Sequence, residues 1–256
     1  MKPAEEILLK DALKSLKLPT VLGDLPECVR QSKAGGDSYE QFLLTLCERE
    51  LQQRRSNQMA RRLKEACFPQ MKALEEAQTE KWRSINAMQI REYAEGGYIQ
   101  KRENLIFVGK HGTGKTHAAI AFGIEACRKG VRTLFTTAAE LVNTLMEARD
   151  EKWLKNYLTK LKKFPLLIID ELGYIPFSEE GSRLLFQVVS DRYEQGSTII
   201  TTNLVFAEWT RVFHEANLTA ALLDRLTHHS HIHQFDWESI RFTDSLARFK
   251  KQKQEN

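Results

Sequence analysis

The residues with the clearest chemical capacity lie in GKHGTGKT, positions 109–116, which has the G-x-x-x-x-G-K-[ST] spacing of a phosphate-binding loop. Gly109, Gly112 and Gly114 allow backbone conformations that turn successive N–H groups toward phosphate oxygens at the start of a helix. Lys115 would contact the β- and γ-phosphates of a nucleotide, and Thr116 would supply a hydroxyl ligand to Mg²⁺. We therefore predict nucleotide binding by this loop and the residue after it: Gly109, Lys110, His111, Gly112, Thr113, Gly114, Lys115, Thr116 and His117.

A second polar group follows the apolar run LLII, residues 166–169. Asp170 and Glu171 come directly after this run, which is typical of a buried strand whose carboxyl end faces a ligand. Asp170 is predicted to hold Mg²⁺ together with Thr116, and Glu171 to act as the general base toward the attacking water. Asn203 ends another apolar run, where its amide could orient that water or sense the γ-phosphate; an ordinary turn residue is the alternative.

Short apolar runs that alternate with helical stretches must position these groups. They are NLIFVG, VRTLFTT, FPLLIIDE, STIITTN and HIHQF. Strands that alternate with helices form a parallel sheet covered on both faces, so the predicted fold class is α/β. The first part of the chain shows only helical patterns, with Ser38 and Gln41 in capping-box positions before a long helix. We therefore predict a small all-α N-terminal domain at residues 1–75 and a nucleotide-binding domain at residues 76–256.

The composition excludes several classes of protein. Charged residues make up 28% of the chain, but the net charge is only +4, so charge alone identifies no partner. The four cysteines form no C-x-x-C pair and are expected to be reduced thiols of a cytoplasmic protein. No apolar run approaches the roughly 18 residues that cross a bilayer, and the N-terminal segment is unlike a signal peptide, so we expect no membrane partner.

Several stretches together resemble one family, the IstB-type ATPases. They are FVGKHGTGKTHAAIAFGIEACRKG, LLIIDELGYIPF, STIITTN and LLDRLTHHSHIHQF. The phosphate loop is generic, whereas DELGYIPF combined with THHSHI separates IstB-like chains from the related DnaC helicase loaders. The resemblance covers most of residues 40–245. It implies an AAA+ P-loop NTPase with a five-stranded parallel sheet in the order 5-1-4-3-2 and a helical N-terminal region.

The resemblance also implies cofactors, partners and site residues. ATP and Mg²⁺ would be the cofactors, and homo-oligomers with ATP sites at subunit interfaces would assemble on DNA and stimulate a transposase. Asn203 matches the sensor after the fourth strand, Arg225 the arginine finger that reaches a neighbouring subunit, and Arg241 the second sensor arginine. An ion pair between Arg225 and Asp224 is the alternative to the finger. The predicted catalytic residues are Lys115, Glu171, Asn203 and Arg225, and Asp170 and Arg241 join the nucleotide-binding set.

Four histidines crowd the segment THHSHIH before and within the last expected strand. His231 and His233 alternate along that strand and share one face, while His228 and His229 precede it on a turn. Two strand histidines can bind a metal, but no cysteine or acidic cluster lies near them in the sequence. Packing or hydrogen bonding is therefore the favoured interpretation.

A basic stretch, KWLKNYLTKLKKF at residues 152–164, contains no acidic residue and has aromatic residues between its lysines. Lysines on a helix that faces DNA neutralise phosphates without reading the sequence. The alternative is a solvated helix face whose aromatic residues lie in the core. The lysines predicted to contact DNA are Lys152, Lys155, Lys160, Lys162 and Lys163.

A second basic cluster lies in RRSNQMARRLK. Arg54 and Arg61 are seven residues apart, as are Arg55 and Arg62, so each pair recurs on one face of a helix. We predict phosphate contacts from these arginines, with ion pairs to glutamates of the same helix as the alternative. Since no base-reading motif is visible, binding to double-stranded DNA is expected to be largely independent of sequence.

These features predict an ATP-dependent, DNA-binding AAA+ protein that assembles on target DNA and recruits a transposase in insertion-sequence transposition. Its Mg²⁺-dependent ATPase activity would act as a timer rather than a motor. A DnaC-like helicase loader is the main alternative and would favour single strands and need a hexameric helicase. A P-loop kinase would need an acceptor site, and a scaffold that binds ATP without turnover would gain nothing from Glu171.

Overall fold

The structure, a computed structural model, describes residues 3–240 of the chain. The chain divides into two compact units, with the division between Arg61 and Arg62. No helix among the described residues is both long and apolar enough to cross a membrane. The predicted second sensor, Arg241, lies outside the described residues.

The N-terminal unit consists of α1 (Pro3–Ser15), α2 (Pro19–Gly35) and most of α3 (Tyr39–Glu65). α3 begins where the capping box predicts, because the Ser38 hydroxyl accepts the N–H of Gln41 and the Gln41 side chain accepts the N–H of Ser38. The buried apolar core of this unit is small: Leu13, Val21, Cys28 and Leu46.

The division between the units falls earlier in the chain than the boundary predicted after residue 75. Residues 62–75 belong to the second unit because their side chains pack on its core, with Ala66 fully buried and Phe68 and Leu74 against neighbouring apolar groups. The backbone continues this attachment, since the N–H of Phe135 donates to the carbonyl oxygen of Ala66 at 2.8 Å. The helical pattern of α3 continues through the division between Arg61 and Arg62, so the sequence does not reveal the change of unit.

The second unit is built on a five-stranded parallel sheet with the strand order β2-β3-β4-β1-β5. Its strands are β1 (Asn104–Gly109), β2 (Thr133–Thr137), β3 (Leu166–Leu172), β4 (Ser197–Thr202) and β5 (Ser230–Phe235). This order is the 5-1-4-3-2 arrangement that the resemblance implies, so the predicted fold class is confirmed.

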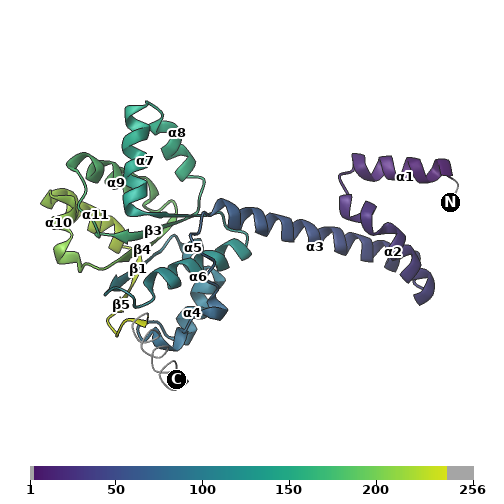
Figure 1. Cartoon of the computed structure of the whole chain (residues 1–256), viewed down its shortest axis with the longest axis horizontal. Helices are drawn as coiled ribbons and strands as arrows, with labels where there is room; N and C mark the ends of the chain where they lie inside the picture. The colour runs from purple at the N-terminus through teal and green to yellow at the C-terminus, as the bar shows by residue number, and fades with distance from the viewer. Residues whose placement is uncertain (1–2, 241–256) are drawn as a thin grey trace, which may run out of the picture. The chain divides into compact units, whose positions relative to one another are not determined.

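Helices cover both faces of this sheet (Figure 1). They are α4 (Ala87–Glu95), α5 (Gly97–Lys101), α6 (Lys115–Arg128), α7 (Ala138–Asp150), α8 (Leu154–Leu161), α9 (Glu179–Arg192), α10 (Thr210–Phe213) and α11 (Ala216–Thr227), with short 3₁₀ turns η1 (Leu74–Glu76), η2 (Thr79–Lys81) and η3 (Phe206–Glu208). Side chains alternate along β1, so Leu105 and Phe107 enter the core beneath α6, while Ile106 and Val108 enter the core beneath α7, α9 and α11.

The helical stretch between the expected strands VRTLFTT and FPLLIIDE forms two helices in the structure. α7 ends at Asp150 and α8 begins at Leu154, because Lys152 adopts a left-handed conformation with φ 64°. The N–H of Trp153 then donates to the carbonyl oxygen of Ala148 at 2.8 Å and closes the turn. Every residue of this turn is compatible with a helix, so composition alone does not reveal the break.

Candidate functional site

The phosphate-binding loop connects β1 to α6, as its position after an apolar run predicts. A Cβ atom at Gly109 would lie 2.0 Å from the carbonyl oxygen of Phe235, so no other residue fits beside β5. Gly112 has φ 77° and its backbone approaches Ser239, whose Oγ would be 2.1 Å from an added Cβ. The glycines thus serve two needs, left-handed backbone and close approach of neighbouring chain segments.

The side chain of Lys115 is folded along the loop. Its ammonium group donates to the carbonyl oxygens of Gly109 and Lys110, each at 2.7 Å, and only 9% of the residue is exposed. The Thr113 hydroxyl also donates to the carbonyl oxygen of Lys110, at 2.9 Å. These bonds hold the ammonium at the mouth of the loop, where the phosphates of a nucleotide would lie.

Two hydroxyl groups, one from the first turn of α6 and one from β4, donate to the carboxylate of Asp170. The Thr116 hydroxyl donates to Asp170 Oδ1 at 3.0 Å, and the Thr201 hydroxyl donates to the same atom at 2.5 Å. Asp170 is only 4% exposed at the end of β3. Oxygen ligands of this kind are those that Mg²⁺ prefers, so Thr116 and Asp170 fit the predicted cation site.

Within β3, Glu171 has an unusual backbone conformation, and its side chain is exposed. Its φ is 59°, in the left-handed region that few non-glycine residues adopt. The Glu171 N–H donates to the Thr201 hydroxyl at 3.0 Å, and the β3–β4 register shifts between Ile169 and Leu172. The same hydroxyl therefore orders Asp170 and Glu171, and the Glu171 carboxylate is exposed at the wall of the cavity.

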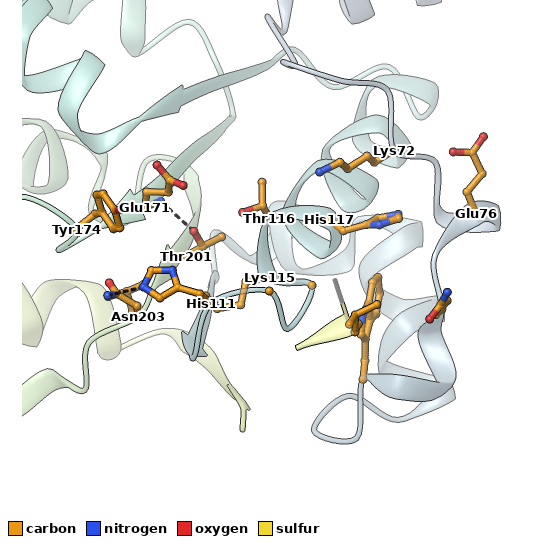
Figure 2. A pocket seen from close by; sticks show the side chains of 16 residues that line it. Lys72, Glu76, His111, Lys115, Thr116, His117, Glu171, Tyr174, Thr201 and Asn203 are labelled. Carbon is orange, nitrogen blue, oxygen red and sulfur yellow. Dashed lines mark hydrogen bonds between the residues drawn. The ribbon is translucent and has the colours of Figure 1, made fainter. Parts of the chain in front are cut away.

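Asn203, predicted as a sensor, lies against the phosphate loop (Figure 2). Its amide Nδ2 is 3.4 Å from Nε2 of His111, and the His111 ring packs edge-on against Tyr174 at 5.7 Å between centroids. From the sequence, His111 is predicted to bind nucleotide only as one of the residues of the loop. The structure makes it the contact between the loop and the segment after β3.

These groups surround a cavity of about 340 Å³. Figure 2 shows Glu171, Tyr174 and Asn203 on one side of Lys115 and Thr116, and Lys72, Glu76 and His117 on the other. The predicted residues that line it are His111, Gly112, Gly114, Lys115, Thr116, His117, Glu171 and Asn203. Asp170 is not in the lining but bonds to Thr116 directly beneath it.

Sequence reasoning missed one wall of this cavity. Lys72, Glu76, Gln78 and Trp82 come from the irregular segment before α4, which has no periodic pattern to mark it. Burial lowers the pKa of His117, whose Nε2 lies 3.4 Å from the carbonyl oxygen of Ala73 in the same segment. Trp82 is far from the phosphate loop in the sequence and approaches Gly114 only in the folded chain, so no local signal indicates this wall.

The chain after β5 also contacts the loop. The Trp237 indole N–H donates to the carbonyl oxygen of Thr113 at 3.0 Å, and the Ile240 N–H donates to that of Gly112 at 2.9 Å. These bonds explain why Gly112 has no room for a side chain near Ser239. The loop is therefore supported from both β5 and the segment that follows it.

Arg225 lies at the opposite edge of the sheet from this cavity. It is in the last turn of α11, and the next residue, Leu226, accepts a hydrogen bond from the Asn104 side chain at the first position of β1. The phosphate loop follows the last position of β1, roughly 16–20 Å away at about 3.3 Å per residue. The Arg225 guanidinium packs over the Phe186 ring at 4.7 Å, so within one chain it does not reach the phosphate loop.

The basic stretch 152–164 presents two different faces. All five of its lysines are exposed, whereas Tyr157 is half-buried and Phe164 buried. The aromatic residues therefore belong to the core, as the alternative predicted, but the lysines remain on the surface. Lys162 lies 3.2 Å from Asp191 of α9, an acidic partner that the local sequence does not reveal.

The α3 arginines that were predicted to contact DNA differ in their surroundings. Arg54 pairs with Glu50 at 2.8 Å, which is the predicted alternative for this residue. Arg55 and Arg61 are exposed in the N-terminal unit, and Arg62 is half-buried in the second unit. The two units therefore divide the predicted cluster.

The strand histidines form hydrogen bonds and pack, as expected. His231 Nε2 lies 3.0 Å from Glu103, and His233 lies between the Tyr93 hydroxyl at 2.9 Å and the carbonyl oxygen of Ser84 at 2.8 Å. Burial lowers the pKa of His233. His228 and His229 are exposed at the amino-terminal edge of the sheet, near Arg225.

The strand order, the loop after β1 and the Asp–Glu pair near the end of β3 define a P-loop NTPase of the AAA+ class. The DnaC helicase loader is 25% identical, with a TM-score of 0.50 over 62% of this chain and 99% of that chain. AMPPCP-bound DnaA from Aquifex aeolicus shares the fold at 17% identity, with a TM-score of 0.54 over 72% of this chain and 56% of that chain.

The model of the IstB-like ATP binding protein family matches residues 11–247, and the chain belongs to this family. The ATP-binding protein of insertion sequence IS232 from Bacillus thuringiensis subsp. berliner is 35% identical over 92% of this chain and 94% of its own length. That of insertion sequence IS21 from Pseudomonas aeruginosa is 35% identical over 92% of this chain and 89% of its own length. The family predicted from the motifs is therefore confirmed.

Proposed function

We propose that this chain hydrolyses ATP with Mg²⁺ in the cavity beside the phosphate loop. The observation that carries the proposal is the chain of hydrogen bonds from Thr116 through Asp170 to Thr201 and the Glu171 backbone. It joins the predicted cation ligands to the predicted base through a single buried carboxylate. A structural ion-binding or scaffold role would not need an exposed glutamate placed at this wall of the cavity.

Each residue of the site has a separate role in ATP hydrolysis. The Lys115 ammonium and the loop N–H groups stabilise the charge that develops on the phosphate oxygens. Glu171 accepts a proton from the water whose oxygen attacks the γ-phosphorus, while the bond to the bridging oxygen of ADP breaks. Asn203 orients that water. Mg²⁺, held through Thr116 and Asp170, supplies further charge stabilisation when it is bound.

We infer further that the ATP site is completed by a second copy of the chain. Arg225 lies at the amino-terminal edge of the sheet, whereas the cavity lies at the carboxyl-terminal edge. An arginine finger supplied from a neighbouring subunit would stabilise the γ-phosphate charge, which accounts for the distance within one chain. Homo-oligomerisation would then be required for hydrolysis.

The assembled protein is proposed to bind double-stranded DNA and to recruit a transposase. Support comes from the insertion-sequence names of the relatives and from the exposed lysines on and beside α8. The second candidate is a helicase loader, which the likeness to DnaC favours. The two functions differ in the DNA strand state that they prefer and in the protein that they recruit.

A DNA-binding assay with nucleotide variants tests this proposal. Fluorescence anisotropy would compare duplex and single-stranded DNA of equal length in the presence of ATP and Mg²⁺. Glu171→Gln should retain ATP and bind duplex DNA, whereas Lys115→Ala, the matched control, should lose ATP-dependent binding. Co-purification with a co-expressed insertion-sequence transposase would support the transposition role. A preference for single strands together with capture of a replicative helicase would replace it with the loader function.

A further inference from the structure

A cluster of three metal-ligating side chains lies at the amino-terminal edge of the sheet, far from the nucleotide cavity. Glu194 is in the turn between α9 and β4, and His228 and His229 connect α11 to β5. One potential ligand atom from each residue lies within 4.8 Å of the other two. His229 Nε2 is 3.9 Å from Glu194 Oε1, and the two imidazole rings have centroids 4.1 Å apart.

These separations are close to those of a metal site. Zinc bonds of about 2.0–2.1 Å in a tetrahedral arrangement place the ligand atoms about 3.3 Å apart. The atoms of the cluster therefore need to move together by roughly 1.5 Å or less. All three side chains are exposed, so small rotations of their side-chain torsions can supply this movement without disturbing the core.

The backbone that carries the ligands is held in place. The Asn104 N–H donates to the carbonyl oxygen of His229 at 2.8 Å, at the start of β1. The Arg102 guanidinium donates to the carbonyl oxygen of Glu194 at 2.6 Å. Two turns that are far apart in the sequence are thus fixed to the short segment 102–104 that leads into β1, which brings the ligands together in the folded chain.

Tyr193 supplies a contact that metal-binding histidines commonly have. Its hydroxyl lies 2.8 Å from Nδ1 of His228. A histidine that binds a metal through one ring nitrogen usually donates a hydrogen bond from the other, which fixes the tautomer and the ring orientation. In the tautomer in which His228 Nδ1–H donates to the Tyr193 hydroxyl, Nε2 of His228 carries the lone pair that can bind a metal.

We propose that Glu194, His228 and His229 bind a divalent transition-metal ion of the Zn²⁺ class. Two imidazoles and one carboxylate form a ligand set that suits Zn²⁺ and its neighbours rather than Mg²⁺ or Ca²⁺. Three protein ligands leave a further coordination position for water or for a ligand from outside the chain. The site does not depend on the proposed function.

The bound ion would join the end of α9 to the end of α11. His228 follows Arg225 by three residues, and its N–H donates to the carbonyl oxygen of Asp224 at 3.1 Å. The ion would therefore restrict the helix end that carries Arg225. Any effect on ATP hydrolysis rests on the proposed function, whereas metal binding itself does not, so the experiment measures binding directly.

The test uses the untagged full-length chain without nucleotide, after treatment with a chelator and dialysis. Cys47→Ser and Cys67→Ser remove the two exposed thiols, which could bind the same metals. Titration with Co²⁺ is followed by its visible absorption, and Zn²⁺ is then added as a competitor. We expect saturation at about one equivalent per chain and displacement of Co²⁺ by Zn²⁺.

Substitutions locate the site. His229→Ala and Glu194→Gln should each weaken Zn²⁺ binding by at least about tenfold, and Tyr193→Phe by about tenfold through the lost hydrogen bond. His231→Gln is the matched control, because His231 lies in the same segment but contacts Glu103 instead. It should bind like the parent chain. Circular dichroism confirms that each variant is folded.

Two results would overturn the proposal. The first is the absence of saturable Co²⁺ or Zn²⁺ binding by the folded parent chain. The second is unchanged affinity in folded His229→Ala and Glu194→Gln, which would place the ion elsewhere. Loss of ATP hydrolysis alone would not bear on the metal site, and an inactive ATPase with intact Zn²⁺ binding would contradict only the proposed function.

Discussion

The two edges of the parallel sheet are built on different principles. At the carboxyl-terminal edge Asp170 and Lys115 are buried, 4% and 9% exposed, and each is hydrogen-bonded to neighbouring groups of the same chain. At the amino-terminal edge Arg225 packs on an aromatic ring, and His228 and His229 lie at the surface. One edge therefore has a polar network formed within a single chain. At the other edge His228 and His229 are exposed, so groups from outside the chain can reach them.

This difference shows which residues can belong to the nucleotide site of a single chain and which cannot. Strand ends in a parallel sheet bring loop residues together at the carboxyl edge, which is where such sheets bind ligands. The groups at the amino edge cannot join that site, because the length of β1 separates them from it. Arg225, His228 and His229 can therefore act only at an interface with another chain or by binding an ion, or they have no role in function.

The largest expected effect comes from Lys115→Ala at the carboxyl edge. It removes the ammonium that the loop carbonyl oxygens hold beside the phosphate position. We expect loss of both ATP binding, measured with a fluorescent ATP analogue, and ATP hydrolysis. Retained hydrolysis at the parent rate would show that the predicted phosphate site is not the site of reaction.

At the other edge, Arg225→Ala should leave ATP binding intact and lower the hydrolysis rate by about 10³-fold. The distance between Arg225 and the cavity in one chain predicts that this loss is restored in trans. When Arg225→Ala and Lys115→Ala are mixed on DNA, some interfaces combine the intact phosphate loop of the first variant with the intact arginine finger of the second. Part of the activity should return. If ATPase activity does not recover although mixed assemblies are shown to form, Arg225 has a structural role. The proposal that it acts on the ATP site of a neighbouring subunit would then be wrong.

Glu171→Gln should separate binding from chemistry within the carboxyl edge. The Glu171 backbone keeps its bond to Thr201, so the cavity should remain formed. We expect unchanged ATP affinity and a hydrolysis rate lower by about 10²-fold or more. Single-turnover hydrolysis measures this step directly. A parent-like rate would move the role of general base to another group.

A smaller effect is expected from the surface lysines, which belong to neither edge. Replacing Lys155, Lys160 and Lys163 by alanine should weaken duplex binding. It should also reduce the slope of log affinity against log salt by up to about 0.9 for each lost phosphate contact. Lys162→Ala is the matched control, because Lys162 already pairs with Asp191. An unchanged slope in the triple variant would direct attention to the exposed arginines of α3.

The smallest expected effect concerns stability at low pH. Burial lowers the pKa of His233 in the folded chain, so below the ordinary imidazole pKa of about 6.5 the unfolded chain takes up a proton that the folded chain does not. The free energy of unfolding should therefore fall as the pH drops below that value, by at most about 1.4 kcal/mol per pH unit from this group. Urea denaturation at several pH values should show a shallower dependence in His233→Gln.

Much of the nucleotide site could be predicted from the sequence because its signals are local. Gly109, Gly112 and Gly114 are needed for backbone reasons that show in their short spacing, and Asp170 follows the buried apolar run at the start of β3. The wall formed by Lys72 to Trp82 could not be predicted, since that segment has no helical or strand periodicity. Its position is set by packing against α6.

The sequence by itself determined the parallel sheet, the phosphate loop and the family, since periodic burial and glycine spacing are properties of short stretches. Only the tertiary structure decided which distant residues meet. It placed Asp191 beside Lys162 and Glu194 beside His228 and His229, and it separated Arg225 from its own phosphate loop. Contacts of this kind depend on the path of the chain between the strands, and no local pattern encodes that path.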